Sequence, residues 1–174
     1  EGAWLWDNNN QRYLDALSGI AVTNLGHAHP AVHQAICRQS ETLIHTSNWY
    51  GIAAQESLAN LLTEKSGMDN VFFSNSGAEA NEAAIKLARK YGHSIGIENP
   101  AIIVMDKSFH GRTLATLSAT GSSKIQQGFE PLVSGFIRVH FNDINAIVNA
   151  VQQNKNVVAI LVEPIQGEGG VNIP

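Results

Sequence analysis

The stretch Val71-Phe72-Phe73-Ser74-Asn75-Ser76-Gly77-Ala78-Glu79-Ala80-Asn81-Glu82-Ala83-Ala84-Ile85-Lys86-Leu87-Ala88-Arg89 decides the fold of this chain. Its apolar start predicts a β-strand over residues 71–74, its small residues predict a tight turn, and the remainder predicts a helix from Gly77 onward. We expect this helix to bury the face on which apolar residues recur at helical spacing: Ala80, Ala83, Ala84, Leu87, Ala88 and Tyr91. A strand, a tight turn and a helix in this order are typical of α/β domains.

The turn before this helix has the composition of a phosphate-binding turn. The first N–H groups of a helix have no partner within the helix and lie at the positive end of its macrodipole, where a phosphate is stabilised. Ser76 can add a hydroxyl donor, and the small Gly77 and Ala78 let phosphate oxygens approach the backbone. The alternative is an ordinary N-cap followed by a turn glycine, which these residues alone do not exclude.

Strand and helix patterns alternate through the rest of the chain. After the helix that begins at Gly77, the expected elements are a strand at 101–105, a helix near 114–117, a strand at 137–141, a helix capped by Asn142 or Asp143, and a buried strand at 157–162. This alternation predicts an α/β domain with a mostly parallel sheet flanked by helices. Because ligands bind such sheets outside the carboxyl ends of the strands, we expect three loops to converge on one crevice: 76–78, 106–112 and 163–170.

The first part of the chain, residues 1–66, is expected to form a hairpin and helices that lead into a large domain at residues 67–174. The predicted elements there are strands at 3–6 and 13–16 around an Asn-rich turn, a helix that starts at Pro30 after the N-cap His29 and includes Leu43 and Ile44, and a helix that ends near Gly67.

The composition is that of a globular domain with one core, with 174 residues, 44% hydrophobic and 15% charged. A net charge of -4 without a block of Lys or Arg argues against nucleic acid or an anionic membrane as partner and favours small molecules. The sequence shows no membrane span and no signal peptide, and the single Cys37 fits a reducing compartment, so we expect a cytoplasmic protein. A start without methionine and a stop at Pro174 suggest truncation at both ends.

The loop expected after the strand at 101–105 places an aromatic ring, an imidazole and a guanidinium within four residues. Phe109 can stack on a planar cofactor, and Arg112 can hold a carboxylate with two parallel hydrogen bonds. A core phenylalanine and a solvated arginine are the alternative interpretation.

The loop expected after the last strand carries two carboxylates, Glu163 and Glu168, next to Pro164 and several glycines. Acidic groups at a cleft can hold or gate a cationic partner. A glycine-rich turn with solvated glutamates is the alternative, and the glycines lack the spacing of a dinucleotide-binding fingerprint.

Other chemistries find less support in the sequence. His27 and His29 have no third ligand at a recognisable spacing, so no metal site is predicted. Ser76 lacks the preceding glycine of a nucleophile elbow, and the chain contains no G-x-x-x-x-G-K motif. Hydrolase and nucleotide triphosphatase functions are therefore not predicted.

In their order and spacing, the motifs together resemble the class III pyridoxal-phosphate aminotransferases of fold type I over the whole chain. The segments that carry the resemblance are 2–7 with 13–15, 19–27, 74–82, 109–113 and 163–168. The resemblance implies that Ser76, Gly77 and Ala78 bind the phosphate of pyridoxal 5'-phosphate. It also implies that Phe109 stacks on the pyridine ring and that Arg112 pairs with a substrate carboxylate.

The resemblance assigns further roles near the substrate. Glu163 would lie close to the substrate side of the cofactor, and Glu168 would be a gate that pairs with an arginine from later in the chain. The lysine that forms the Schiff base and the carboxylate that binds the pyridine nitrogen would both follow Pro174. None of the six lysines of this chain lies in the sequence context of that catalytic lysine: Lys65, Lys86, Lys90, Lys107, Lys124 and Lys155.

The resemblance is greatest to family members that act on N-acetylornithine. It implies transfer of the δ-amino group of N-acetylornithine to 2-oxoglutarate, as in arginine synthesis, by a homodimer with the active site at the subunit interface. Ornithine and 4-aminobutyrate are alternative amino donors. A hypothesis of another class is a non-catalytic module that binds phosphate or cofactor.

Overall fold

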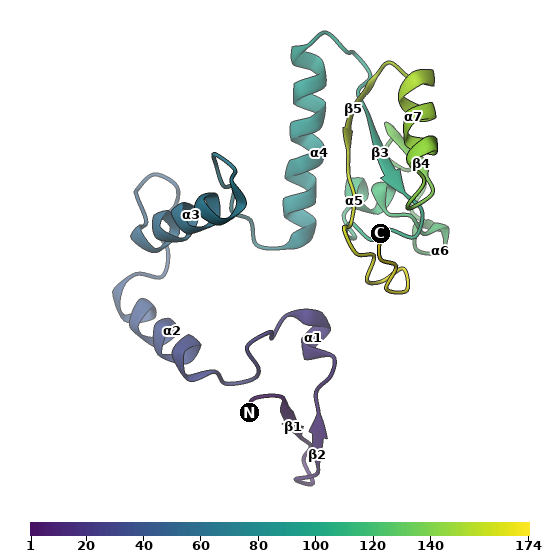
Figure 1. Ribbon diagram of the computed structural model, residues 1–174. Helices are drawn as coiled ribbons and strands as arrows, with labels where there is room; N and C mark the ends of the chain where they lie inside the picture. Colours follow the sequence, from purple (N-terminus) through teal and green to yellow (C-terminus); the bar gives the residue numbers. More distant parts are fainter. The chain divides into compact units, whose positions relative to one another are not determined.

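The computed structural model describes residues 1–174, which form two compact units, Glu1–Asn70 and Val71–Pro174 (Figure 1). The elements of the first unit are β1 (Trp4–Trp6), β2 (Arg12–Leu14), α1 (Ser18–Ala21), α2 (Pro30–Thr42) and α3 (Ala53–Ser66). Those of the second are α4 (Gly77–Ser94), β3 (Ala101–Met105), α5 (Leu114–Ala119), α6 (Ser123–Gln126), β4 (Phe136–Val139), α7 (Ile144–Gln153) and β5 (Val157–Ile160). None of these helices combines the length and the apolar character needed to cross a membrane.

The first unit opens with the predicted hairpin, in which β1 and β2 pair antiparallel with Leu5 opposite Tyr13. The Asp7 carboxylate accepts hydrogen bonds from the backbone N–H groups of Asn9 and Gln11, both at 2.9 Å, and so shapes the turn. An aspartate that bonds the main chain ahead of it is a typical turn former. The hairpin prediction is therefore confirmed.

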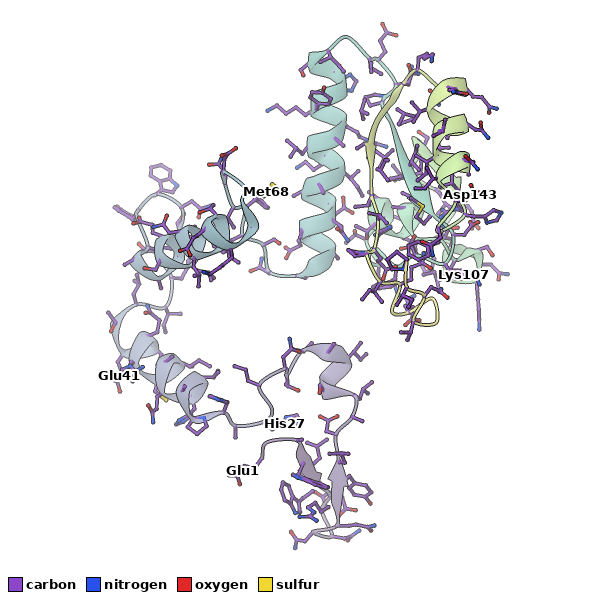
Figure 2. All side chains as sticks on the ribbon, in the orientation of Figure 1. Glu1, His27, Glu41, Met68, Lys107 and Asp143 are labelled. Carbon is purple, nitrogen blue, oxygen red and sulfur yellow. The ribbon has the colours of Figure 1, made fainter.

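A hydrogen bond between side chains joins the end of this hairpin to the loop before α2. His27 Nε2 lies 2.6 Å from Asp15 Oδ2, and the other carboxylate oxygen accepts from the Ser18 N–H at 2.8 Å (His27 is labelled in Figure 2). These bonds favour the charged carboxylate, with that from His27 contributing most, and lower the pKa of Asp15.

The two longer helices of this unit begin and end largely as predicted. α2 starts at Pro30 with His29 as its N-cap, and α3 ends before Gly67, which is left-handed with φ 70°. The inclusion of Leu43 and Ile44 in α2 is wrong. Leu43 is extended, with φ -160°, and its N–H already ends the helix by donating to Gln39 O.

The second unit is built on a parallel sheet with the strand order β4-β3-β5 (Figure 1). All five residues of the central β3 are buried, and successive side chains point to opposite faces. On one face, Ile102 and Val104 pack with Ile85 of α4. On the other face, Ile103 and Met105 form a second cluster, against which Ile147 of α7 packs. Helices on both faces of a parallel sheet confirm the predicted α/β class.

α7 is capped by Asp143, one of the two caps expected from the sequence (Figure 2). Its Oδ1 accepts a hydrogen bond from the Ala146 N–H at 2.8 Å. The strand before it, β4, spans Phe136–Val139 rather than the predicted 137–141.

One strand prediction is wrong, and another is correct in place but not in length or burial. Residues 71–74 are not a strand, because no other segment of the chain pairs with them. β5 is shorter than predicted and only half-buried, with Ile160 exposed. Its position explains this, because it pairs with β3 along one edge and has no neighbour along the other. A run of apolar residues indicates a strand but does not fix how many neighbours the strand has.

The predicted buried face of α4 is only partly correct. Ala88 packs against the core as expected and Ala83 is half-buried, but the other predicted residues are exposed: Ala80, Ala84, Leu87 and Tyr91. The fully buried residues of this helix, Ile85 and Gly92, lie outside the predicted set. Gly92 permits close packing, because a Cβ there would lie 2.6 Å from Pro100 Cγ. Alanines occur on both sides of this helix, so their spacing alone could not identify the side that is buried.

Candidate functional site

The site is built around the first turn of α4, where Ser76 is the N-cap. Ser76 has extended backbone angles, φ -153° and ψ 162°, and its Oγ accepts a hydrogen bond from the Glu79 N–H at 3.2 Å. The backbone N–H groups of Ser76, Gly77 and Ala78 have no hydrogen-bond partner. These three donors lie at the positive end of a helix of 18 residues, so this helix end can bind an anion.

Glu79 bonds back to the residue before the N-cap and leaves the N-cap N–H of Ser76 free, so the pair does not form a complete capping box. Its Oε2 accepts from the Asn75 N–H at 2.8 Å and lies 3.3 Å from Ser76 Oγ. The Ser76 hydroxyl therefore points its proton toward Glu79 in this structure. A phosphate bound here would compete with Glu79 for that hydroxyl but not for the three free N–H groups.

Gly77 fits a ligand-binding role better than a packing role. A Cβ placed on Gly77 would meet no atom of the protein within 4 Å, and its φ lies outside the left-handed region. Neither packing nor backbone conformation therefore requires glycine at this position. The space beside Gly77 is open to an approaching phosphate, which is consistent with the sequence prediction.

The loop that follows β3 lies directly against this helix end. Gly111 has φ 134°, which disfavours other residues, and a Cβ there would lie 2.5 Å from Thr116 Oγ1 and 3.0 Å from Ala78 Cβ. The contact between Gly111 and Ala78 brings two of the loops predicted to converge, 76–78 and 106–112, into one place.

Two polar residues of α4 that the sequence analysis did not assign hold this loop. Asn81 Nδ2 donates to the His110 carbonyl oxygen at 2.9 Å, and the Thr113 hydroxyl donates to the Glu82 carboxylate. The helical spacing of these two residues from Ala78 could have indicated this role from the sequence. Asn81 and Glu82 lie three and four residues after Ala78, and therefore on the same side of the helix.

The loop after β5 completes the convergence. Phe109 is half-buried, and its N–H donates to Glu163 Oε2 at 2.8 Å. Gln166, which is fully buried, donates from Nε2 to the Asp106 carbonyl oxygen at 2.8 Å. Lys107 lies at this end of the sheet (Figure 2), and a Cβ on Gly169 would approach its carbonyl oxygen to 2.4 Å. The loops after β3 and β5 are thus in contact.

The remaining predicted residues lie around Phe109. The exposed Arg112 places its Cζ 5.7 Å from the centroid of the Phe109 ring, within the range of a cation–π contact. The exposed Glu168 lines a hollow of about 190 Å³ together with Phe109 and Ile125. Arg112 and Glu168 are therefore both near the aromatic ring, and both remain accessible to a ligand.

His110 is buried beneath the loop, with 3% of its surface exposed, and its Nε2 has no hydrogen-bond partner. Burial is the main cause that lowers its pKa to about 4, and the charge of Arg138 adds to the effect. The imidazole is therefore neutral at pH 7. The backbone of His110 is fixed at both ends, because its N–H donates to Thr120 Oγ1 at 3.0 Å and its carbonyl accepts from Asn81.

This arrangement can bind an elongated ligand with an anionic end and a planar ring. The free N–H groups of α4 would take the anion, and the Phe109 ring lies on the loop that contacts the same helix end. Arg112 offers a cation for a carboxylate next to that ring. The structure contains no cluster of three or more His, Cys, Asp or Glu side chains that could hold a metal ion.

An α/β unit with free N–H groups at a helix N-terminus and an aromatic ring at the carboxyl end of a neighbouring strand is an arrangement suited to a phosphorylated cofactor. The family model for class III aminotransferases matches residues 1–174, and the chain belongs to this family.

Curated relatives carry the name acetylornithine aminotransferase. The protein of that name from Nitrosomonas europaea is 62% identical over 174 residues, which is all of this chain and 44% of the relative. The one from Prochlorococcus marinus is 53% identical over 177 residues, which cover 99% of this chain and 42% of the relative. The chain thus spans less than half the length of the curated relatives it matches.

Solved structures agree with this family. The ornithine aminotransferase of Toxoplasma gondii matches all of this chain and 42% of its own, with a TM-score of 0.94 and 36% identity. An (S)-enantioselective omega-transaminase from Thermomicrobium roseum matches all of this chain and 44% of its own, with a TM-score of 0.92 and 30% identity.

Proposed function

We propose that the whole protein is a pyridoxal-phosphate-dependent aminotransferase and that this chain supplies the phosphate site and one wall of the cofactor pocket. The observation that carries the proposal is the contact between Gly111 and Ala78, which places the loop of Phe109 against the free N–H groups of α4. One of the matched ornithine aminotransferase structures is described as having partial occupancy of PLP at its active site.

In this proposal the residues have separate tasks. Ser76, Gly77 and Ala78 bind the cofactor phosphate, and Phe109 stacks on its ring. Arg112 holds a substrate carboxylate near that ring. Pyridoxal phosphate supplies an electron sink for the amino acid, a chemistry that the side chains of a protein do not provide.

The two glutamates act on the substrate side of the ring. Glu163 fixes the Phe109 main chain and places a half-buried carboxylate at the end of β5. Glu168 is exposed beside Phe109, where it can attract or release a cationic partner. We propose that it pairs with an arginine outside residues 1–174.

We propose N-acetylornithine as the amino donor and 2-oxoglutarate as the acceptor, a reaction of arginine biosynthesis. The names of the curated relatives at 53–62% identity support this choice. The names of two ornithine aminotransferase structures from Toxoplasma gondii, at 36% and 37% identity, support ornithine as the second candidate. 4-Aminobutyrate is the third.

Further parts of the proposal concern the whole protein. The Schiff-base lysine and the carboxylate for the pyridine nitrogen would lie outside residues 1–174, and the active form would be a cytoplasmic homodimer. Residues 67–174 would be the first part of the large cofactor-binding domain, with 1–66 leading into it. These remain predictions.

The test uses the full-length protein with pyridoxal phosphate, 2-oxoglutarate and each of the three amino donors. We expect glutamate to form, with kcat/KM at least about tenfold higher for N-acetylornithine than for ornithine or 4-aminobutyrate. A preference for ornithine would overturn the donor, and the absence of glutamate with every donor would overturn the activity.

A second measurement tests the lysine assignment. Borohydride reduction of the cofactor-loaded protein, followed by peptide mass spectrometry, should label one lysine that is not among the six of this chain. A stoichiometric label on any of those six would contradict the assignment. A protein that binds the cofactor without this label and without transamination would be a non-catalytic binding module.

A further inference from the structure

We propose that Asn81 is a positioning residue of the cofactor site. Its side-chain amide holds the loop of Phe109 at a fixed place along α4. The distance between the Phe109 ring and the phosphate-binding N–H groups at the start of α4 is thereby kept constant. This inference rests on the proposed function, because it concerns how the pyridoxal phosphate site is held together.

Asn81 occupies an unusual place for a polar residue. It lies on the side of α4 that faces the sheet, between Ala78 and the buried Ile85, and is itself half-buried. An amide in such a place costs free energy unless it is hydrogen-bonded. Its Nδ2 donates to the His110 carbonyl oxygen at 2.9 Å, and this acceptor belongs to the residue directly after Phe109.

The bond lies in the middle of three contacts between the helix and the loop. Gly111 lies against Ala78, the His110 carbonyl accepts from Asn81, and the Thr113 hydroxyl donates to Glu82. Positions 78, 81 and 82 lie on one side of the helix because they are spaced by three and four residues. The first turns of α4 therefore carry both the free N–H groups proposed to bind phosphate and the residues that hold the loop of Phe109. Because the helix is rigid, it fixes the distance between them.

Three successive backbone groups of the loop are held by side chains from three different segments. The Phe109 N–H donates to Glu163, the His110 N–H donates to Thr120 Oγ1, and the His110 carbonyl accepts from Asn81. Of these three anchors, only Asn81 belongs to the helix that carries Gly77 and Ala78. Loss of the Asn81 hydrogen bond should therefore shift the Phe109 ring relative to the free N–H groups of α4. The ring and the N–H groups themselves should stay intact.

The test uses the full-length protein, with Asn81→Asp and Asn81→Ala as the test variants. Asn81→Asp keeps the size of the side chain but removes the donor, and Asn81→Ala removes the whole amide. Asn149→Asp and Asn149→Ala are the matched controls, because Asn149 is an exposed asparagine of α7 without a side-chain hydrogen bond.

We expect the dissociation constant of pyridoxal phosphate to rise about tenfold in both Asn81 variants, as for the loss of one half-buried hydrogen bond. The induced circular dichroism of the bound cofactor should fall, because it reports the orientation of the ring. Inorganic phosphate should compete for the site within about twofold of its original strength, because the free N–H groups remain in place. The Asn149 variants should match the wild type in all three measurements.

The same variants can be examined without cofactor. Hydrogen exchange of the backbone at residues 109–113 should be faster in Asn81→Ala than in Asn149→Ala, a difference that does not depend on activity. The inference is overturned if the Asn81 and Asn149 variants agree in ring dichroism and exchange. It is also overturned if phosphate and pyridoxal phosphate weaken in parallel. A wild-type protein that binds no pyridoxal phosphate would instead contradict the proposed function, while faster exchange in Asn81→Ala would still support the anchor.

Discussion

The Glu163 carboxylate accepts a hydrogen bond from the Phe109 backbone N–H, with 2.8 Å between Oε2 and N, across 54 residues of sequence. The two residues follow β5 and β3, which are parallel neighbours in the sheet. The carboxyl ends of both strands therefore meet at one edge, where a charged acceptor can reach a main-chain donor. The bond ties the loop of the candidate aromatic residue to the loop of the candidate acidic residues.

Replacement of Glu163 by alanine should lower the free energy of unfolding by about 1–3 kcal/mol, because the Phe109 N–H loses its charged acceptor. Glu163→Gln should lower the free energy of unfolding less, since its amide oxygen can still accept the hydrogen bond from the Phe109 N–H. Urea unfolding of the cofactor-free protein measures both. Glu168→Ala, at an exposed carboxylate, should stay within about 0.5 kcal/mol of the wild type. Equal losses at Glu163 and Glu168 would show that the hydrogen bond contributes nothing.

Gly77→Ala should separate folding from ligand binding. A Cβ at Gly77 meets no protein atom within 4 Å, and alanine favours a helix more than glycine does, so the free energy of unfolding should stay equal or rise. The methyl group would instead occupy space that we assign to phosphate, so the affinity for pyridoxal phosphate should fall. Urea unfolding and a cofactor titration give the two values. An unchanged affinity would contradict the phosphate assignment.

Gly111→Ala should be strongly destabilising, and Gly170→Ala is its matched control. Both glycines have positive φ, 134° and 115°, so both substitutions strain the backbone. Only at Gly111 would the new Cβ overlap neighbours, namely Thr116 and Ala78. Gly111→Ala should therefore cost about 1–3 kcal/mol more than Gly170→Ala, the usual cost of overpacking. If the two substitutions lower the free energy of unfolding equally in urea, the loop of Gly111 can move away from α4 without loss of stability.

The features predicted correctly from the sequence are those that local chemistry decides. β3 was predicted at residues 101–105 because five successive apolar residues form a buried central strand. The cap at Asp143 and the turn at Asp7 depend on side chains that bond their own neighbouring backbone. Such bonds need no distant partner, so their pattern is visible in a short window.

The features missed or mistaken depend on partners far away in the sequence. Residues 71–74 have the pattern of a strand but no pairing partner in this chain. Ile160 is exposed because β5 has a neighbouring strand along only one edge. The role of Asn81 depends on the carbonyl of His110, 29 residues later. The motif residues 76–78 and Phe109 could be predicted as a site, whereas the contacts that place them together required the structure.

His110 should make the stability of the protein depend on pH. Burial, with the nearby charge of Arg138, lowers its pKa from 6.5 to about 4, so the folded protein keeps this imidazole neutral where the unfolded chain binds a proton. The stabilisation is therefore fully present above about pH 6.5 and is lost as the pH falls toward about 4. The total loss amounts to at most about 3 kcal/mol.

His110→Gln removes this titrating group, so the fall in the free energy of unfolding between pH 7 and pH 5 should become smaller by about 2 kcal/mol. His93→Gln is the control, because His93 is an exposed histidine in the same unit and its replacement should leave the fall unchanged. Urea unfolding of the cofactor-free protein at the two pH values gives the comparison. Because the prediction concerns the difference between two pH values, a general loss of stability in His110→Gln does not affect it. Equal pH dependence in the two variants would show that the imidazole is protonated in the folded protein as readily as in the unfolded chain.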